Sequence, residues 1–178
     1  MLIVLATKKH WMIHQLDVRS SFLNGELKEE VYLEQTEGFV EKGKEHLVCR
    51  LKKALYGLKQ APRSWYEKID LFFLQLGYNR SKNYPNMYTM KYEKGHIVLI
   101  SLYVDDLIIT GDAISLIKEI KQQMSQVFEM KDLGELRYCL GLEIWRDSGQ
   151  TFLSQGKYVK GLLERFRMDQ CKAVTIPL

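Results

Sequence analysis

The fold is decided by one stretch, residues 97–110, in which the apolar runs 97–102 and 107–110 flank Tyr103-Val104-Asp105-Asp106. Two apolar runs around a short polar step are typical of a β-hairpin, with the acidic pair at its tip. A buried charge is costly unless it is paired or bound to a metal ion. Asp17, after the apolar stretch 11–16, is the candidate third carboxylate. Three carboxylates together could hold two divalent cations for phosphoryl transfer.

Apolar alternation and turn residues predict the first strand of this hairpin and further strands on both sides of it. These strands cover residues 11–18, 31–35, 47–51, 87–92, 96–104, 136–145 and 150–154. Helical segments alternate with strand pairs and do not follow single strands. This order favours an α+β fold, an antiparallel sheet with helices packed on one face, over a doubly wound parallel sheet.

Three helices are predicted from apolar residues at helical spacing. The first begins at Ala61-Pro62 and ends before Gly77, which is a natural C-terminal stop. The second follows Asp112 as its N-cap. The last lies near the end of the chain. The inward stripes of the three are Trp65, Ile69, Phe72, Phe73 and Leu76; Ile117, Ile120, Met124, Val127 and Phe128; and Tyr158, Leu162, Leu163 and Phe166.

Length and composition indicate one domain over residues 1–178. The chain is 46% hydrophobic and 27% charged, which is ordinary for a soluble globular protein. Its apolar start, residues 1–6, is too short for a signal peptide, and no run approaches the ~20 apolar residues of a membrane span. Cys49, Cys139 and Cys171 are far apart and are expected to be reduced. We expect an intracellular protein, cytoplasmic or nuclear and not secreted.

Charge is unevenly distributed along the sequence. The net charge is +4, residues 26–45 are mostly acidic, and residues 44–63 are mostly basic. The basic segment suits a nucleic-acid backbone. The alternative is a solvated surface without a ligand. The candidate nucleic-acid contacts are Lys52, Lys53, Lys59 and Arg63.

Five blocks in a fixed order resemble one family. They are Gln15-Leu16-Asp17-Val18 with Phe22-Leu23-Asn24-Gly25, then residues 55–65, Tyr103-Val104-Asp105-Asp106, residues 140–144, and Leu153-Ser154-Gln155. This set is similar to the reverse transcriptase of Ty1/copia-type retrotransposon Pol polyproteins. The resemblance implies a polymerase palm with part of the fingers, in a right-hand architecture. It also implies RNA-directed DNA synthesis from an RNA template, a DNA primer and deoxynucleoside triphosphates.

The resemblance assigns a role to each matching residue. Asp17, Asp105 and Asp106 would hold two Mg²⁺ or Mn²⁺ ions, Asp105 bridging with Asp17 and Asp106 contributing less directly. Phe22 would be the wall that excludes a ribose 2′-hydroxyl. The remaining substrate contacts would be Gln60 near the template base and incoming nucleotide, Tyr103 beside the acidic pair, and Lys131 as a donor to pyrophosphate.

The resemblance also implies what surrounds this segment. Family members carry an upstream fingers segment and continue toward an RNase H domain, and neither is recognised in these residues. We therefore expect the isolated chain to be impaired in synthesis, because charge-assisted hydrogen bonds to the triphosphate are missing. The family setting is a cytoplasmic virus-like particle or the nucleus, without a membrane. The sequence leaves the oligomeric state open.

Three other functions stay open at this point. The first is a non-catalytic nucleic-acid-binding relic that uses the basic segment. The second is another palm-type two-metal enzyme, such as a nucleotide cyclase. The third is a structural α+β domain whose aspartates bind nothing.

Taken singly, each candidate also has a structural interpretation. The acidic pair could be a turn and Asp17 a strand end. Phe22 could be a core residue, Gln60 a helix cap and Lys131 a surface lysine.

Overall fold

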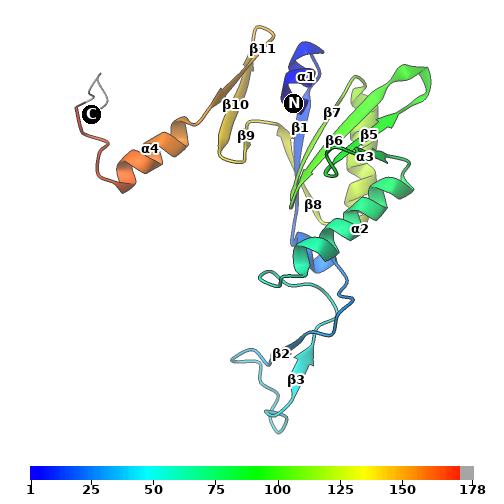
Figure 1. Cartoon of the computed structure of the whole chain (residues 1–178), viewed down its shortest axis with the longest axis vertical. Helices are drawn as coiled ribbons and strands as arrows, with labels where there is room; N and C mark the ends of the chain where they lie inside the picture. Colours follow the sequence, from blue (N-terminus) through cyan, green and yellow to red (C-terminus); the bar gives the residue numbers. More distant parts are fainter. Residues whose placement is uncertain (173–178) are drawn as a thin grey trace.

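The centre of the molecule is a six-stranded antiparallel sheet in the order β4-β5-β6-β7-β1-β8 (Figure 1). The computed structural model describes residues 1–172. The predicted antiparallel sheet is confirmed, and β6 and β7 form the predicted hairpin around Val104 and Asp105. The strands are β1 (Ile13–Val18), β4 (Asn79–Arg80), β5 (Met87–Lys91), β6 (Ile97–Tyr103), β7 (Asp106–Gly111) and β8 (Met130–Glu135).

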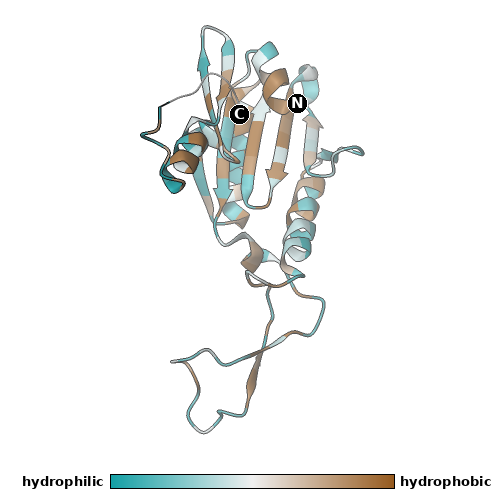
Figure 2. Ribbon diagram, turned by 60° about the vertical axis from the view of Figure 1, so that its left-hand side comes forward, coloured by the Kyte–Doolittle hydropathy of each residue, from teal (hydrophilic) through white to brown (hydrophobic). Residues whose placement is uncertain are grey.

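Two helices, α2 (Ala61–Gln75) and α3 (Ile114–Val127), cover one face of this sheet. Leu16 and Val18 of β1 belong to the same buried cluster as Trp65 of α2 and Ile117 of α3. Successive strand residues point to opposite faces, so Asp17, between these two, points to the other face. Figure 2 shows apolar residues along the central strands, where this core lies.

The opposite face is partly covered by α1 (Leu2–Lys8) and by a small sheet of β9 (Tyr138–Cys139), β10 (Leu142–Asp147) and β11 (Gln150–Ser154). Leu2, Ala6 and Ile13 share a second buried cluster with Leu136 and Ile144. The expectation that helices pack on one face holds for α2 and α3 and is wrong for α1. Seven residues are too few for a helical period to be recognised in the sequence.

An extended arm leaves the sheet after β1. The arm follows η1 (Ser21–Asn24) and contains β2 (Tyr32–Glu34) and β3 (Val48–Arg50), which pair with each other. A bridge between Glu26 and Lys53 closes its base. Both strands are exposed throughout, and Figure 1 shows the arm projecting from the body.

The last described helix, α4 (Gly156–Arg165), corrects one prediction. The helical spacing predicts that Tyr158, Leu162, Leu163 and Phe166 point inward, but all four are exposed. Figure 1 shows α4 projecting away from the central sheet. The apolar stripe makes the helix amphipathic, but within residues 1–172 no residue of α4 is buried.

Several element boundaries also differ from the sequence prediction. Asp112 does not cap α3, because the N-cap residue of this helix is Ala113. The Asp112 carboxylate instead accepts the Ile97 N–H at 3.0 Å. Val127 is exposed and does not join the core. The predicted strand 136–145 breaks into β9 and β10, because Leu140 and Gly141 take positive φ angles. β8 was not predicted, and residues 93–95 form η2 (Glu93–Gly95).

The helices of the described residues are too short or too polar to span a membrane. None of them combines the length and the apolar character needed to cross a bilayer.

Candidate active site

Four predicted site residues form one row across the sheet. Tyr103 of β6 lies opposite Asp106 of β7, Asp106 lies opposite Asp17 of β1, and Asp17 lies opposite Lys131 of β8. Directly opposed residues of antiparallel strands project from the same face of the sheet. The fold therefore gathers two acidic, one basic and one aromatic side chain from four separate strands.

Asp105 lies beside this row in the turn between β6 and β7. Its carbonyl oxygen accepts the Val18 N–H at 3.0 Å, which ties the turn to β1. Val104, the preceding residue, has a φ angle of 56°. A β-branched residue rarely adopts a positive φ, so this turn holds local strain. The buried Trp65 indole N–H donates to the Val104 carbonyl oxygen and fixes the turn against α2.

The acidic side chains repel one another. Burial raises the pKa of Asp17, and the negative charges of Asp105 and then Asp106 raise it further. Lys131 and Arg19 act in the opposite direction but do not cancel the rise in pKa. The Gln15 side-chain amide donates to Asp106 Oδ1 at 3.1 Å. The site therefore holds an excess of negative charge.

Hard cations would suit this donor set chemically, because Mg²⁺ and Mn²⁺ take carboxylate oxygens. A cation would also relieve the repulsion that raises the pKa of Asp17. Across residues 1–172, however, no three His, Cys, Asp or Glu side chains are gathered closely enough to hold a metal ion. The residues fit the cations in chemistry and in charge, and the carboxylates are not drawn together into a finished coordination shell.

A shallow apolar pocket of about 240 Å³ opens beside the turn. Phe22 is only 7% exposed, and its ring packs 4.7 Å from the Tyr56 ring, centroid to centroid. Tyr103 and Val104 connect the pocket to the acidic row. The lining residues are Phe22, Pro62, Trp65, Tyr66, Asn86, Leu102, Tyr103 and Val104.

Three residues of the site were missed in the sequence. Gln15 and Tyr56 stand inside recognised blocks, so their positions were a usable signal. Asn86 gave none: its side-chain amide donates to the Leu102 carbonyl at 3.1 Å, and the two residues are 16 positions apart along the chain.

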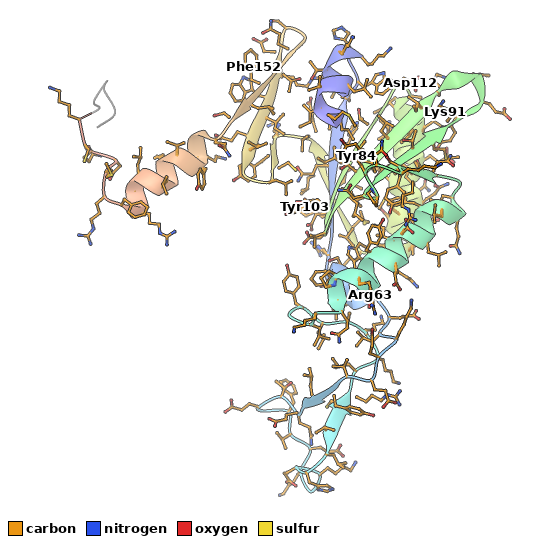
Figure 3. The ribbon with its side chains drawn as sticks, viewed as in Figure 1. Arg63, Tyr84, Lys91, Tyr103, Asp112 and Phe152 are labelled. Atoms are coloured by element: carbon orange, nitrogen blue, oxygen red, sulfur yellow. The ribbon has the colours of Figure 1, made fainter. Side chains whose placement is uncertain are left out.

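Gln60 is not a member of the acidic row and is the N-cap residue of α2. Its side chain makes no capping hydrogen bond, and the residue is half-buried. Arg63 lies one turn further into the helix, and Figure 3 shows it near the end of the sheet that carries Tyr103.

Fewer of the predicted basic residues carry an uncompensated charge in the structure than the sequence indicates. Arg63 forms ion pairs with Glu29 and Glu67, so its charge is largely neutralised. Lys52, Lys53 and Lys59 are exposed, and within the described residues none of the three has an ion-pair partner. Arg50 of the basic segment pairs with Glu30 of the acidic segment, and Lys68 of α2 pairs with Glu26 of the acidic segment.

Comparison with known proteins identifies the family. Residues 1–178 match the family model described as reverse transcriptase (RNA-dependent DNA polymerase). The chain is 45% identical over 168 residues to the retrovirus-related Pol polyprotein from transposon TNT 1-94 of Nicotiana tabacum, covering 93% of this chain and 13% of that protein. It is 41% identical over 173 residues to the Pol polyprotein from transposon RE1 of Arabidopsis thaliana, covering 97% of this chain and 12% of that protein.

A shorter relative is also a transposon protein. The putative transposon Ty5-1 protein YCL074W of Saccharomyces cerevisiae is 32% identical over 164 residues, covering 92% of this chain and 53% of that protein. The chain thus spans only part of each of these relatives. On the family match and these identities, the chain belongs to the reverse transcriptase family, among the Pol polyproteins of Ty1/copia-type transposons.

Proposed function

We propose that this chain is the palm and part of the fingers of an RNA-directed DNA polymerase from a copia-type retrotransposon. Its substrates would be deoxynucleoside triphosphates on an RNA template with a DNA primer. The observation that carries the proposal is the row in which Asp17 and Asp106 face each other between Tyr103 and Lys131. Family membership makes polymerisation the expected use of such a row.

Asp17, Asp105 and Asp106 would hold two Mg²⁺ or Mn²⁺ ions. When bound, such ions lower the pKa of an attacking hydroxyl and stabilise the oxygens of a leaving pyrophosphate. The assignment is supported by the cross-strand facing of Asp17 and Asp106, and by the pKa of Asp17, which burial raises first and the negative charges of Asp105 and Asp106 raise further. Neighbouring strands carry Asp17 and Asp106, and the turn between β6 and β7 carries Asp105, so bound cations would only have to draw the three carboxylates closer together.

The surrounding residues would bind and orient the substrate. Phe22, held against Tyr56, would form the wall under the sugar and exclude a 2′-hydroxyl. Tyr103 would border the same pocket, and Gln60 would lie near the template base. Lys131, opposite Asp17, would donate a proton to the pyrophosphate oxygens.

The exposed lysines would bind the nucleic-acid backbone. Lys52, Lys53 and Lys59 suit this role better than Arg63, because Arg63 is already paired with two glutamates. Phosphate contacts of this kind make binding weaker as the salt concentration rises.

Primer extension on a homopolymeric RNA template tests the proposal. We expect Mn²⁺- or Mg²⁺-dependent incorporation that falls about 100-fold or more in Asp105→Asn, equivalent to ~2.7 kcal/mol of transition-state stabilisation. Asp147→Asn, at an exposed carboxylate that ends β10, is the matched control and should retain full activity. Salt-sensitive RNA binding without metal-dependent incorporation in any variant would instead indicate a non-catalytic nucleic-acid-binding protein.

A further inference from the structure

The position of Lys131 depends on an irregularity in β8. The pairing of β1 with β8 shifts by one residue between Gln15, which faces Gly134, and Leu16, which faces Asp132. Leu133 is the extra residue, and Gly134 has a φ angle of +76°. This is a β-bulge, a feature that re-aims the side chains beyond it.

A regular ladder without the bulge would change the charge beside Asp17. Continuing the register of Gln15 with Gly134 would place Asp132 opposite Asp17 and move Lys131 to the other face. The row would then contain three acidic residues and no lysine. The bulge therefore decides the sign of the charge that faces the candidate metal ligand.

Hydrophobic burial alone does not favour the regular ladder. Leu133 is 42% exposed in the bulge. In the regular register it would lie opposite the buried Leu16, on the face that α2 and α3 cover. Met130, which packs against this core opposite Val18, would leave the covered face in exchange, and Lys131 would take its place. Burial of Met130 therefore supports the bulged register, and a second interaction supports it as well.

That interaction is made by Lys121 of α3. The side chain of Lys121 is only 14% exposed, and its ammonium donates to both Asp132 oxygens, at 3.0 and 2.9 Å. It also lies 3.2 Å from His14 Nδ1. Asp132 Oδ1 in turn accepts the Gly134 N–H at 2.9 Å, which closes the bulge. In the regular register Asp132 would leave this face, and the largely buried ammonium of Lys121 would lose both of its hydrogen bonds to the Asp132 carboxylate.

We propose that Lys121 is a positioning residue: by holding the Asp132 carboxylate on the helix-covered face, it fixes the bulge at Leu133 and sets Lys131 opposite Asp17. The effect of Lys121 on the register of β1 with β8 is inferred from these interactions alone. The consequence for catalysis rests on the proposed function. The competing interpretation is that the bulge merely protects the edge strand β8 from pairing with other chains. Under that interpretation Lys121 has no influence on the register.

NMR cross-strand nuclear Overhauser effects (NOEs) measure the register directly. Val18 faces Met130, and its N–H points to the Asp105 carbonyl, away from β8. The Hα atoms of Val18 and Met130 should therefore show a strong NOE, because Cα atoms of such pairs are only ~4.5 Å apart. In the regular register the Val18 Hα would show this NOE to the Lys131 Hα instead.

The decisive comparison uses Lys121→Met with and without deletion of Leu133. In Lys121→Met with Leu133 retained, we expect the NOE from the Val18 Hα to move from the Met130 Hα to the Lys131 Hα. Deletion of Leu133 removes the extra residue, so the NOE to Met130 should return even in the absence of the Lys121 ammonium. Lys118→Met, an exposed lysine on the same helix, is the control and should leave the Met130 NOE unchanged.

A Val18–Met130 NOE that persists in folded Lys121→Met would overturn the proposal. Its absence from the Leu133 deletion variant would overturn the proposal as well. If Lys121→Met does not fold, Asp132→Asn replaces it, because the amide keeps one acceptor but has no charge. A Val18–Met130 NOE that persists in Asp132→Asn, or that is absent after deletion of Leu133 from this variant, would then overturn the proposal.

Primer extension adds a functional measurement. The kcat of Lys121→Met should fall to that of Lys131→Met, with KM for the nucleotide changed less than twofold, and deletion of Leu133 should restore it. An absence of incorporation by every variant would contradict the proposed function, whereas the NOEs would still decide the register.

Discussion

Asp17 of β1 and Asp106 of β7 are direct cross-strand partners in the central sheet. Like charges at such positions destabilise a sheet. Here the neighbouring turn adds Asp105, and the charges of Asp105 and Asp106 raise the pKa of Asp17 beyond the effect of burial. The fold therefore keeps a repulsive cluster where a neutral pair would be more stable, which is typical of a functional site.

Asp17→Asn should stabilise the metal-free protein while abolishing synthesis. The raised pKa means that ionised Asp17 opposes folding at neutral pH, and this penalty disappears once the group is protonated, below its ordinary value of 3.8. We expect the variant to melt about 1–4 °C higher than the wild type at pH 7, measured by differential scanning calorimetry without divalent cations. An unchanged or lower melting temperature would contradict the repulsion, and Asp147→Asn is the control.

Trp65→Phe should loosen the turn that carries the acidic pair. The indole N–H donates to the carbonyl of the strained Val104, and phenylalanine cannot replace this hydrogen bond. We expect the free energy of unfolding from urea titration to fall by roughly 1–3 kcal/mol, because a buried acceptor is left unsatisfied and the core is underfilled. Trp145→Phe, on an exposed tryptophan, should cost much less. Equal decreases in the two variants would show that the hydrogen bond contributes nothing.

Phe22→Leu should weaken discrimination against ribonucleotides. The ring borders the pocket next to Tyr103, and leucine is shorter at the edge that would face the sugar while still filling the core. We expect the ratio of ribonucleotide to deoxynucleotide incorporation, measured as kcat/KM, to rise about tenfold, or ~1.4 kcal/mol. Phe152→Leu, on the distant β11, is the control (Figure 3). An unchanged ratio would assign Phe22 to the core alone.

His14 should make stability fall as the pH is lowered through about 6.5. Burial lowers the pKa of His14 in the folded protein and the charge of Lys121 lowers it further, while Asp132 and Glu135 act in the opposite direction. The unfolded chain therefore binds a proton near the usual value of 6.5 that the folded protein does not bind, and protonation favours unfolding.

Urea titrations between pH 7.5 and 5.5 measure this slope. His14→Gln should reduce the slope, whereas His46→Gln, on the exposed arm, should retain it. Equal slopes in both variants would remove His14 as the source.

The sequence was most informative where a local pattern determines the structure. The hairpin over β6 and β7 and the helix α2 follow from short apolar periods, and both are confirmed. The partners of these elements required interactions that no local pattern encodes. The register of β8 is an example, since Lys121 binds Asp132 from a separate helix.

Other differences have the same origin. The stripe on α4 indicated an amphipathic helix, but amphipathicity does not say what covers the apolar side, and Phe166 is 64% exposed. The basic segment is defined by charge along the chain, whereas in space Arg63 is paired with Glu29 from the acidic segment. The three aspartates could be named from the sequence. That Asp17 lies directly opposite Asp106 is known only from the register of β1 with β7.

Calorimetric titration with Mn²⁺ tests most directly whether Asp17, Asp105 and Asp106 act as one cation site. We predict saturable binding to the wild type that is abolished or weakened at least about tenfold in Asp17→Asn and in Asp105→Asn, and kept in Asp147→Asn. Identical binding heats in the wild type and both site variants would contradict a shared cation site.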